Sequence, residues 1–330
     1  MENNGKNVQA FLFDQIKKQL PVSVSMVDSI ADLLKISNDS AYRRLRGETL
    51  INIEELLILC DYFKIPIDTL QESANNYVTF KYLSLSNDNQ SLENYLSGIL
   101  AEMEIVKLAT EKHILFTCED LPIFHYFKYD TLTAFKLYYW NKCILNAPSL
   151  EKTKFSKEIF PKNLLDIAYK IYENYTLTPS TEIWTTDTIA SVIKQIEFCW
   201  ESGLIENQEI LLEIIFQLED MMKSIEHNTE RGSKSLTDSA PNYTIYCSEV
   251  MIGNNCIQVS MNDLQVIYFS FNTFNSMQTH NNSFCKETDT WIKHLQKKSI
   301  QISQVSEKQR YQFFNKIKKM ISDLKKRLEI

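Results

Sequence analysis

The chain has 330 residues, of which 44% are hydrophobic and 23% charged, and its formal net charge is −7. This length suffices for two or three domains with real cores, and six glycines with neither GxGxxG nor GxxxxGK[ST] argue against phosphate-cradling loops. The apolar runs are short and interrupted by charge, and the polar start MENNGKN is unlike a signal peptide, so we expect a cytoplasmic protein without membrane spans.

The chain opens with two predicted helices. Residues 7–20 carry apolar side chains on one face, and Pro21 ends this amphipathic helix. Ser25 is a suitable N-cap for the second helix, in which Ile30 and Ala31 face inward. The small side chain of Ala31 allows the next helix to cross closely.

Three further helices are predicted after this pair. Ser37 caps a third helix over 38–46, which ends at Gly47, where a left-handed residue is needed. Asn52 caps a fourth helix that runs to residue 63, and a fifth helix opens at 65–68 and ends near residue 73. A tight turn followed by an arginine-bearing helix is the layout of a helix-turn-helix DNA reader.

The faces of the third helix follow from 100° per residue. Ala41 points at the core, and the candidates for DNA contact are polar: Asn38, Ser40, Tyr42, Arg43, Arg44 and Arg46. Arg43 is expected to read a base edge, with Tyr42 and Asn38 assisting, because arginine pairs with guanine through two hydrogen bonds. Arg46 at the helix end suits a phosphate contact, and Arg44 sits at the flank of the core stripe.

Several positions agree with one known pattern: Ile30-Ala31, Leu34-x-Ile36-Ser37, Arg43, Arg46-Gly47, Leu56-Leu57-x-Leu59 and Phe63-x-Ile65. Residues 1–75, about a fifth of the chain, thereby resemble the Cro/cI (XRE) helix-turn-helix family. The resemblance implies a five-helix lambda-repressor-like domain whose helix 38–46 lies in the major groove of double-stranded DNA, usually in a dimer. Lys35 holds the turn position usually taken by glycine, so a left-handed backbone is expected there. Asp39 also departs from the pattern, because it lies on the face meant for DNA.

The same arginines allow a second interpretation. A solvated helix face with Asp39 and Arg43 paired four residues apart would look alike in sequence. Residues 1–75 hold eight Lys and Arg against eleven Asp and Glu, although phosphate contacts usually dominate DNA affinity. The alternative function is therefore a protein-interaction scaffold or antitoxin-like partner that uses this module without sequence-specific DNA binding.

Helical periodicity dominates residues 80–230 and predicts a larger helical domain for sensing or assembly. Aromatic residues are dense within 116–140. They form either a ligand pocket with His125 or Tyr129 as polar handles, or the core between helical layers.

The last third of the chain changes character. The small polar residues 232–242 predict a linker, and 243–261 predict a hairpin, followed by a strand over 264–271. Two helices come next, the second with a capping box made by Ser306 and Gln309.

Positive charge collects at the end of the sequence. Residues 293–330 hold eleven Lys and Arg against three Asp and Glu. This segment is either a docked amphipathic helix with a solvated lysine face, a support for DNA or anionic partners, or a dimer seam.

Seven scattered cysteines and five dispersed histidines form no CxxC or HExxH motif. They predict reduced thiols, no metal site and no cofactor, and nothing in the sequence indicates an enzyme. The predicted fold is mainly α, with a helix-turn-helix domain at 1–75, a helical domain at 80–230 and a small α+β region at 243–330. The expected function is a homodimeric transcriptional regulator, in which 80–330 sense an unidentified small-molecule or peptide effector or oligomerise.

Overall fold

Helices make up most of the chain, in agreement with the mainly α prediction. The computed structural model describes residues 4–20, 24–63, 65, 67–70, 78–85, 89–235, 242–272 and 275–330. The chain divides into two compact units, Met1–Thr79 and Phe80–Ile330, and each has its own hydrophobic core.

The first unit consists of short helices around a small core. Its elements in chain order are α1 (Asn4–Gln19), α2 (Met26–Leu34), α3 (Asn38–Leu45), α4 (Ile53–Tyr62) and the 3-10 turn η1 (Ile67–Leu70). Leu12, Ile30, Ala41 and Leu59 are completely buried, so each of the four α-helices contributes to this core. The predicted fifth helix begins as η1, and its expected end near residue 73 lies outside the described residues.

The predicted helix caps of this unit are confirmed. The Ser25 hydroxyl accepts a hydrogen bond from the Asp28 N–H at 3.3 Å, and the Ser37 hydroxyl accepts one from the Ser40 N–H at 3.3 Å. Asn52 forms a capping box with Glu55 at the start of α4. These side chains satisfy backbone donors that a helix leaves unpaired in its first turn, which fixes where each helix begins.

Two left-handed residues end α2 and α3. Gly47 follows α3 with φ 70°, as predicted. Lys35 ends α2 with φ 53°, which confirms the left-handed turn at a position where the side chain makes that conformation unfavourable.

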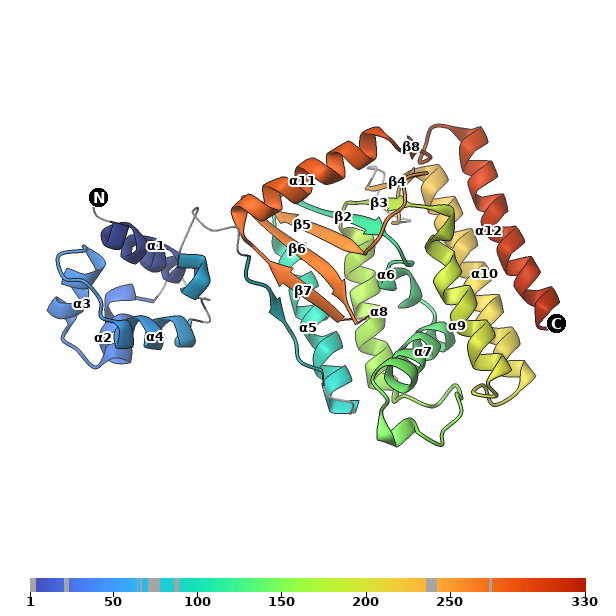
Figure 1. The fold of residues 1–330 in the computed structure, drawn as a ribbon, viewed down its shortest axis with the longest axis horizontal. Coiled ribbons are helices and arrows are strands. Elements are labelled where there is room, and N and C mark those ends of the chain that lie inside the picture. Colours follow the sequence, from blue (N-terminus) through green and yellow to red (C-terminus); the bar gives the residue numbers. More distant parts are fainter. Residues whose placement is uncertain are drawn as a thin grey trace. The chain divides into compact units, whose positions relative to one another are not determined.

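An eight-stranded mixed sheet organises the second unit (Figure 1). The strands are β1 (Lys81–Tyr82), β2 (Lys112–Cys118), β3 (Ser180–Trp184), β4 (Tyr243–Cys247), β5 (Cys256–Met261), β6 (Leu264–Phe271), β7 (Asn275–Thr279) and β8 (Ile300–Gln301). They lie in the order β1-β7-β6-β5-β2-β3-β4-β8. β2, β3 and β4 are parallel, and the other neighbours are antiparallel.

Helices cover both faces of this sheet (Figure 1). The helices that contribute to the larger core are α5 (Asn89–Leu108), α6 (Ile123–Tyr126), α7 (Asp130–Tyr139), α8 (Lys162–Leu177), α9 (Ala190–Glu201), α10 (Gln208–Arg231) and α12 (Glu307–Arg327). Helix α11 (Asn282–Lys297) contributes to a smaller core on the opposite face of the sheet. Neighbouring residues of β3 show the division, because Trp184 joins the larger core and Ile183 the smaller one.

The expected division between 80–230 and 243–330 is wrong, because both parts supply strands to one sheet. β2 and β3 from the expected helical domain pair with β5 and β4 from the expected C-terminal region. β2 has a central position and is largely buried, and the stretch ILF within its sequence KHILFTC is apolar without alternation. Such a run does not differ in periodicity from a buried helical segment.

Two further predictions for 232–261 are also wrong. β4 and β5 do not pair with each other, since β4 lies between β3 and β8 and β5 lies between β2 and β6. The expected linker is partly interior. Ser233, Lys234 and Ser235 are buried, while 236–241 lie outside the described residues.

Helix α12 is an amphipathic helix docked on the second unit. Phe313, Phe314, Ile317, Ile321 and Leu324 are buried on its apolar face, as expected. The capping box does not form, because Ser306 has φ 55° and its side chain caps no N–H.

Three basic side chains of α12 are engaged by acids of neighbouring helices. Lys318, Lys325 and Arg327 form ion pairs with Glu226, Glu219 and Glu197 on α10 and α9. This arrangement matches the interpretation of α12 as a docked helix and leaves fewer charges for an anionic partner.

The aromatic stretch 116–140 belongs to the core. Tyr126, Phe127, Phe135 and Tyr138 are at most 1% exposed. His125 is buried too, with its Nε2 atom 2.8 Å from Oε1 of Glu182. Tyr129 is only 9% exposed, so neither His125 nor Tyr129 is supported as the polar handle of a ligand pocket.

Candidate functional site

The exposed face of α3 is the first candidate site. Tyr42 is 50% exposed, and the side chains of Arg43 and Arg46 are 59% and 60% exposed. Ala41 is buried on the opposite side. The surface therefore presents the three side chains that the sequence assigned to base reading and phosphate contact.

Both exposed arginines have weak partners within the unit. Nε of Arg43 lies 3.2 Å from Asp39 Oδ2, and Nε of Arg46 lies 3.3 Å from Glu48 Oε1. The Arg46 guanidinium also lies 5.3 Å from the centre of the Tyr42 ring. Exposed ion pairs contribute roughly 0–1 kcal/mol, so a phosphate or a base edge can replace these partners at low cost.

Asn38 and Ser40 have local structural contacts. Nδ2 of Asn38 donates to Oδ1 of Asp28 at 2.9 Å, which ties the start of α3 to α2. Ser40 accepts a hydrogen bond from the Ser37 hydroxyl at 2.9 Å. Their polar atoms thus support the turn before α3, and neither side chain is as free as Tyr42.

Arg44 has a structural role instead of the expected DNA contact. Its Nη2 and Nε atoms donate to the two carboxylate oxygens of Glu55 at 2.7 and 3.0 Å. The hydrogen bond from Arg44 holds the pKa of Glu55 below its usual value. Arg44 therefore joins α3 to α4 and is removed from the DNA-contact candidates.

Gln9 on α1 also holds α3 in place, and the sequence interpretation missed it. Its Nε2 atom donates to the carbonyls of Arg44 and Thr49 at 2.7 and 2.9 Å, and its Oε1 accepts from the Ile51 N–H at 2.9 Å. Only its position near the apolar face of α1 signals this role in the sequence. Helix α3 is thus anchored from α1 as well as from α4.

A cleft in the second unit is the other candidate site, and the sequence interpretation did not predict it. It lies where β2, β3 and β4 end, and its volume is about 1140 Å³. The strand ends supply Glu119, Asp120, Thr185, Thr186, Asp187, Cys247, Ser248 and Glu249. The carboxyl ends of parallel strands are the usual ligand position in sheets of this kind.

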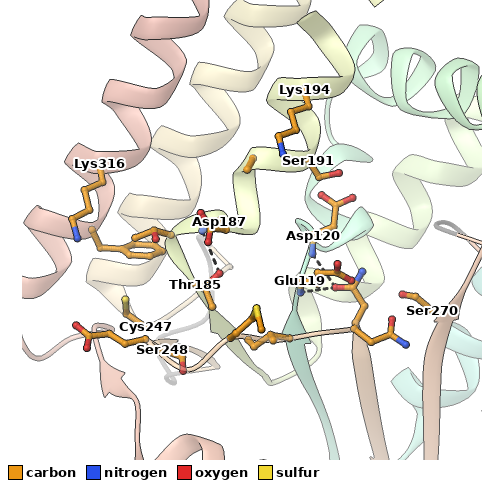
Figure 2. Close-up of a pocket in the computed structure, with 18 of the residues that line it drawn as sticks. Glu119, Asp120, Thr185, Asp187, Ser191, Lys194, Cys247, Ser248, Ser270 and Lys316 are labelled. Carbon is orange, nitrogen blue, oxygen red and sulfur yellow. Dashed lines mark hydrogen bonds between the residues drawn. The ribbon is translucent and has the colours of Figure 1, made fainter. Parts of the chain in front are cut away.

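Two helices complete the walls of the cleft. Figure 2 shows Ser191 and Lys194 on α9 and Lys316 on α12, with the strand-end residues beside them. Neither lysine forms an ion pair with any residue that the structure describes. Both ammonium groups are therefore available to a ligand or to water.

Asn255 fixes the acidic end of the cleft. Its Oδ1 accepts hydrogen bonds from the N–H groups of Glu119 at 2.9 Å and Asp120 at 3.1 Å. The Asp120 carboxylate is 2.8 Å from Nζ of buried Lys136. Burial, with a smaller contribution from the charge of Asp120, raises the pKa of Glu119.

A polar network is buried in the core around Glu182 on β3. The Glu182 carboxylate is completely buried and accepts from Trp184 Nε1 at 2.7 Å, Tyr243 Oη at 3.1 Å and the Tyr175 hydroxyl. His125 provides the fourth contact, and His125 and Tyr175 hold the pKa of Glu182 below its usual value despite burial. The network therefore serves the core.

Lys234 approaches the same network from the expected linker. Its Nζ donates to the Thr178 carbonyl at 2.8 Å and to the Ser180 hydroxyl at 2.6 Å, and it lies 3.5 Å from the centre of the Tyr175 ring. Burial lowers the pKa of Lys234 to about 7, although Glu182 opposes this shift.

The sequence does contain a weak signal for the cleft. The strands β2, β3 and β4 are each followed at once by polar residues, in the strings CEDLP, WTTDT and CSEV. These strings become informative only when the three segments are known to be parallel neighbours.

The described residues show no cluster of three or more His, Cys, Asp or Glu side chains that suits a metal ion. No helix among them has the length and hydropathy that a membrane crossing requires. Comparison of the chain with protein-family models, with curated proteins and with solved structures finds no match.

Proposed function

We propose that the chain is a sequence-specific DNA-binding transcriptional regulator that acts as a homodimer. In this proposal α3 enters the major groove and Arg43 reads a base edge. The supporting observation is that Arg43 is exposed on a helix with a fixed position. That helix is held in place by its N-cap, by Gln9 and by the Arg44–Glu55 pair. An arginine paired with guanine contributes roughly 1–3 kcal/mol of discrimination.

Arg46 is assigned a phosphate contact in the same complex. It lies at the end of α3 with an exposed guanidinium and a weakly held acidic partner. In a two-fold symmetric dimer the half-sites are expected one helical turn apart, roughly 10 base pairs. The unit Phe80–Ile330 would then carry effector binding in the cleft, or dimer formation.

The test is selection of bound duplexes from a random DNA pool with the full-length chain. Arg43→Ala should abolish enrichment of the selected sequence. Lys17→Ala removes the same charge from an exposed position on α1 and should leave enrichment unchanged. Equal enrichment with Arg43→Ala and the unaltered chain would contradict the assignment of Arg43.

The second candidate function is a protein-interaction module. It is favoured by exposed apolar side chains on α4, where Ile53 is 75% exposed, Leu57 47% and Tyr62 65%. The excess of acidic residues in 1–75 also agrees with it. DNA affinity that does not fall as salt rises would favour this candidate, because phosphate contacts release counterions.

A further inference from the structure

A smaller apolar cavity adjoins the cleft of the second unit. It has a volume of about 130 Å³ and lies between α5 and the strands β2, β5 and β6. Its lining is mainly aliphatic and aromatic and includes Ile99, Met103, Phe116, Ile257 and Phe269. A dry cavity of about 150 Å³ binds benzene in another protein, so this one suits a single ring or a short alkyl group.

The cavity and the cleft meet at three polar residues. Asp120, Asn255 and Ser270 line both hollows. A ligand with an apolar group in the cavity would therefore place its polar end beside Asp120. Asn255 holds the backbone at this point through the N–H groups of Glu119 and Asp120.

Two adjacent carboxylates at this junction can receive a cation. The carboxylates are Asp120 and the neighbouring Glu119, with Glu102 in the apolar cavity; the ammonium groups are that of Lys136, which is paired with Asp120, and those of Lys194 and Lys316 on the helical walls of the cleft. Lys136 already donates to Asp120 at 2.8 Å and to Gln195 Oε1 at 3.0 Å. An anionic head group beside Asp120 would meet the neighbouring Glu119 carboxylate, whereas an ammonium group there could donate to both carboxylates.

We propose that the apolar cavity and the Asp120 end of the cleft form one binding site for a small primary amine that carries an apolar group. The ring or alkyl group fills the space under α5, and the ammonium group lies between Asp120 and Glu119. Binding of such an amine does not require the proposed regulatory function; only the role of the amine as an effector rests on that function. The binding test uses no DNA, so the two proposals can fail separately.

The experiment is calorimetric titration of the full-length chain with three probes. 2-Phenylethylamine has both the ring and the ammonium group, 3-phenylpropionate has the ring with an anionic head, and ethylamine lacks the ring. We expect 2-phenylethylamine to bind, and the other two to bind at least about tenfold more weakly. No binding of 2-phenylethylamine up to about 10 mM, or equal binding of 3-phenylpropionate, would overturn the proposal.

Two variants separate the contributions of the ring and the head. Ile99→Phe fills the cavity from α5 and should weaken 2-phenylethylamine binding about tenfold, whereas Ile105→Phe makes the same change at a 61% exposed position of α5 and should have no effect. Glu119→Gln removes one carboxylate at the surface of the cleft. It should reduce the ratio of the affinity for 2-phenylethylamine to the affinity for 3-phenylpropionate. Unchanged binding in both Ile99→Phe and Glu119→Gln would contradict the assigned site.

Discussion

Arg44 and Glu55 form a two-point ion pair that joins α3 to α4. The side chains are only 16% and 13% exposed, and both carboxylate oxygens are engaged at 2.7 and 3.0 Å. Glu55 also accepts the Asn52 N–H at 3.1 Å, so the same carboxylate caps α4. The position of α3, the proposed reading helix, therefore depends on Arg44, whose side chain is largely buried.

Glu55→Gln should destabilise the first unit by about 1.5–3 kcal/mol, because a hydrogen bond between two charged groups is lost. Hydrogen exchange of the α3 and α4 amides would measure this change. Asp39→Asn breaks the exposed pair with Arg43 and should change the free energy of unfolding, as measured by amide exchange, by less than about 1 kcal/mol. Equal effects of the two substitutions would show that burial of the Arg44–Glu55 pair has no energetic consequence.

The same pair gives the first unit a defined response to acid. Because the pKa of Glu55 is lowered on folding, its stabilisation is complete above the ordinary value of 4.5 and is lost as pH falls through the folded-state pKa. Protection of the α3 amides should therefore decrease below pH 4.5, and the decrease should be smaller in Glu55→Gln. Parallel pH profiles for the two proteins would contradict this linkage.

Lys35→Gly should stabilise the first unit by about 1 kcal/mol, because glycine adopts the left-handed conformation without the clash that a side chain causes. Lys35→Ala is the matched control, since it removes the charge but keeps the Cβ atom at φ 53°. We expect slower amide exchange in α2 and α3 for the glycine variant alone. A similar gain in Lys35→Ala would attribute the effect to charge instead of the backbone.

Arg46→Ala should weaken DNA binding to all sequences about equally and reduce the slope of log affinity against log salt by about one. The reason is that a phosphate contact contributes affinity and releases a counterion without reading sequence. Fluorescence anisotropy at several salt concentrations would measure the slope. Lys17→Ala should leave the slope unchanged, and a changed sequence preference in Arg46→Ala would reassign Arg46 to base reading.

Lys234 should make the stability of the second unit rise with pH. Its folded-state pKa of about 7 lies below the usual 10.5, so between these values the unfolded chain binds the additional proton and folding gains stability as pH increases. Thiols with raised pKa, such as that of Cys256, oppose this trend near pH 9 and above. The comparison is therefore made between pH 7 and 8.5, where thermal unfolding of Lys234→Met should depend less on pH than that of the unaltered chain. Equal dependence would contradict a buried, easily deprotonated Lys234.

The first unit could be read from sequence because its signals are local. Ser25, Ser37 and Asn52 act within three residues of their own position, and Gly47 ends the helix that directly precedes it. The role of Arg44 was not local, since it depends on Glu55, eleven residues away. The sequence placed Arg44 at the flank of the core stripe, which is compatible with either role.

The second unit could be read only in part because its sheet joins distant segments. The strands β5 and β6 and the helices α11 and α12 follow from local periodicity, but the partners of β2 and β3 do not. The cleft could not be predicted for the same reason. Glu119, Asp187 and Glu249 lie around one cleft only because the three strands that precede them are parallel neighbours. Lys234 was assigned to a linker because small polar residues surround it, although its ammonium group is satisfied inside the fold.

The central position of β2 also affects how the chain is made. Thr117 on β2 donates a hydrogen bond to the Cys256 carbonyl, 139 residues later. A nascent polypeptide that leaves the ribosome can form the first unit early, whereas β2 and β3 must wait for β4 and β5 to be synthesised. Closing contacts over such separations slows folding. Synthesis stopped within 232–242 would release a chain in which β2 and β3, largely buried in the folded protein, lack β5 and β4; such a chain is a substrate for chaperones and proteases.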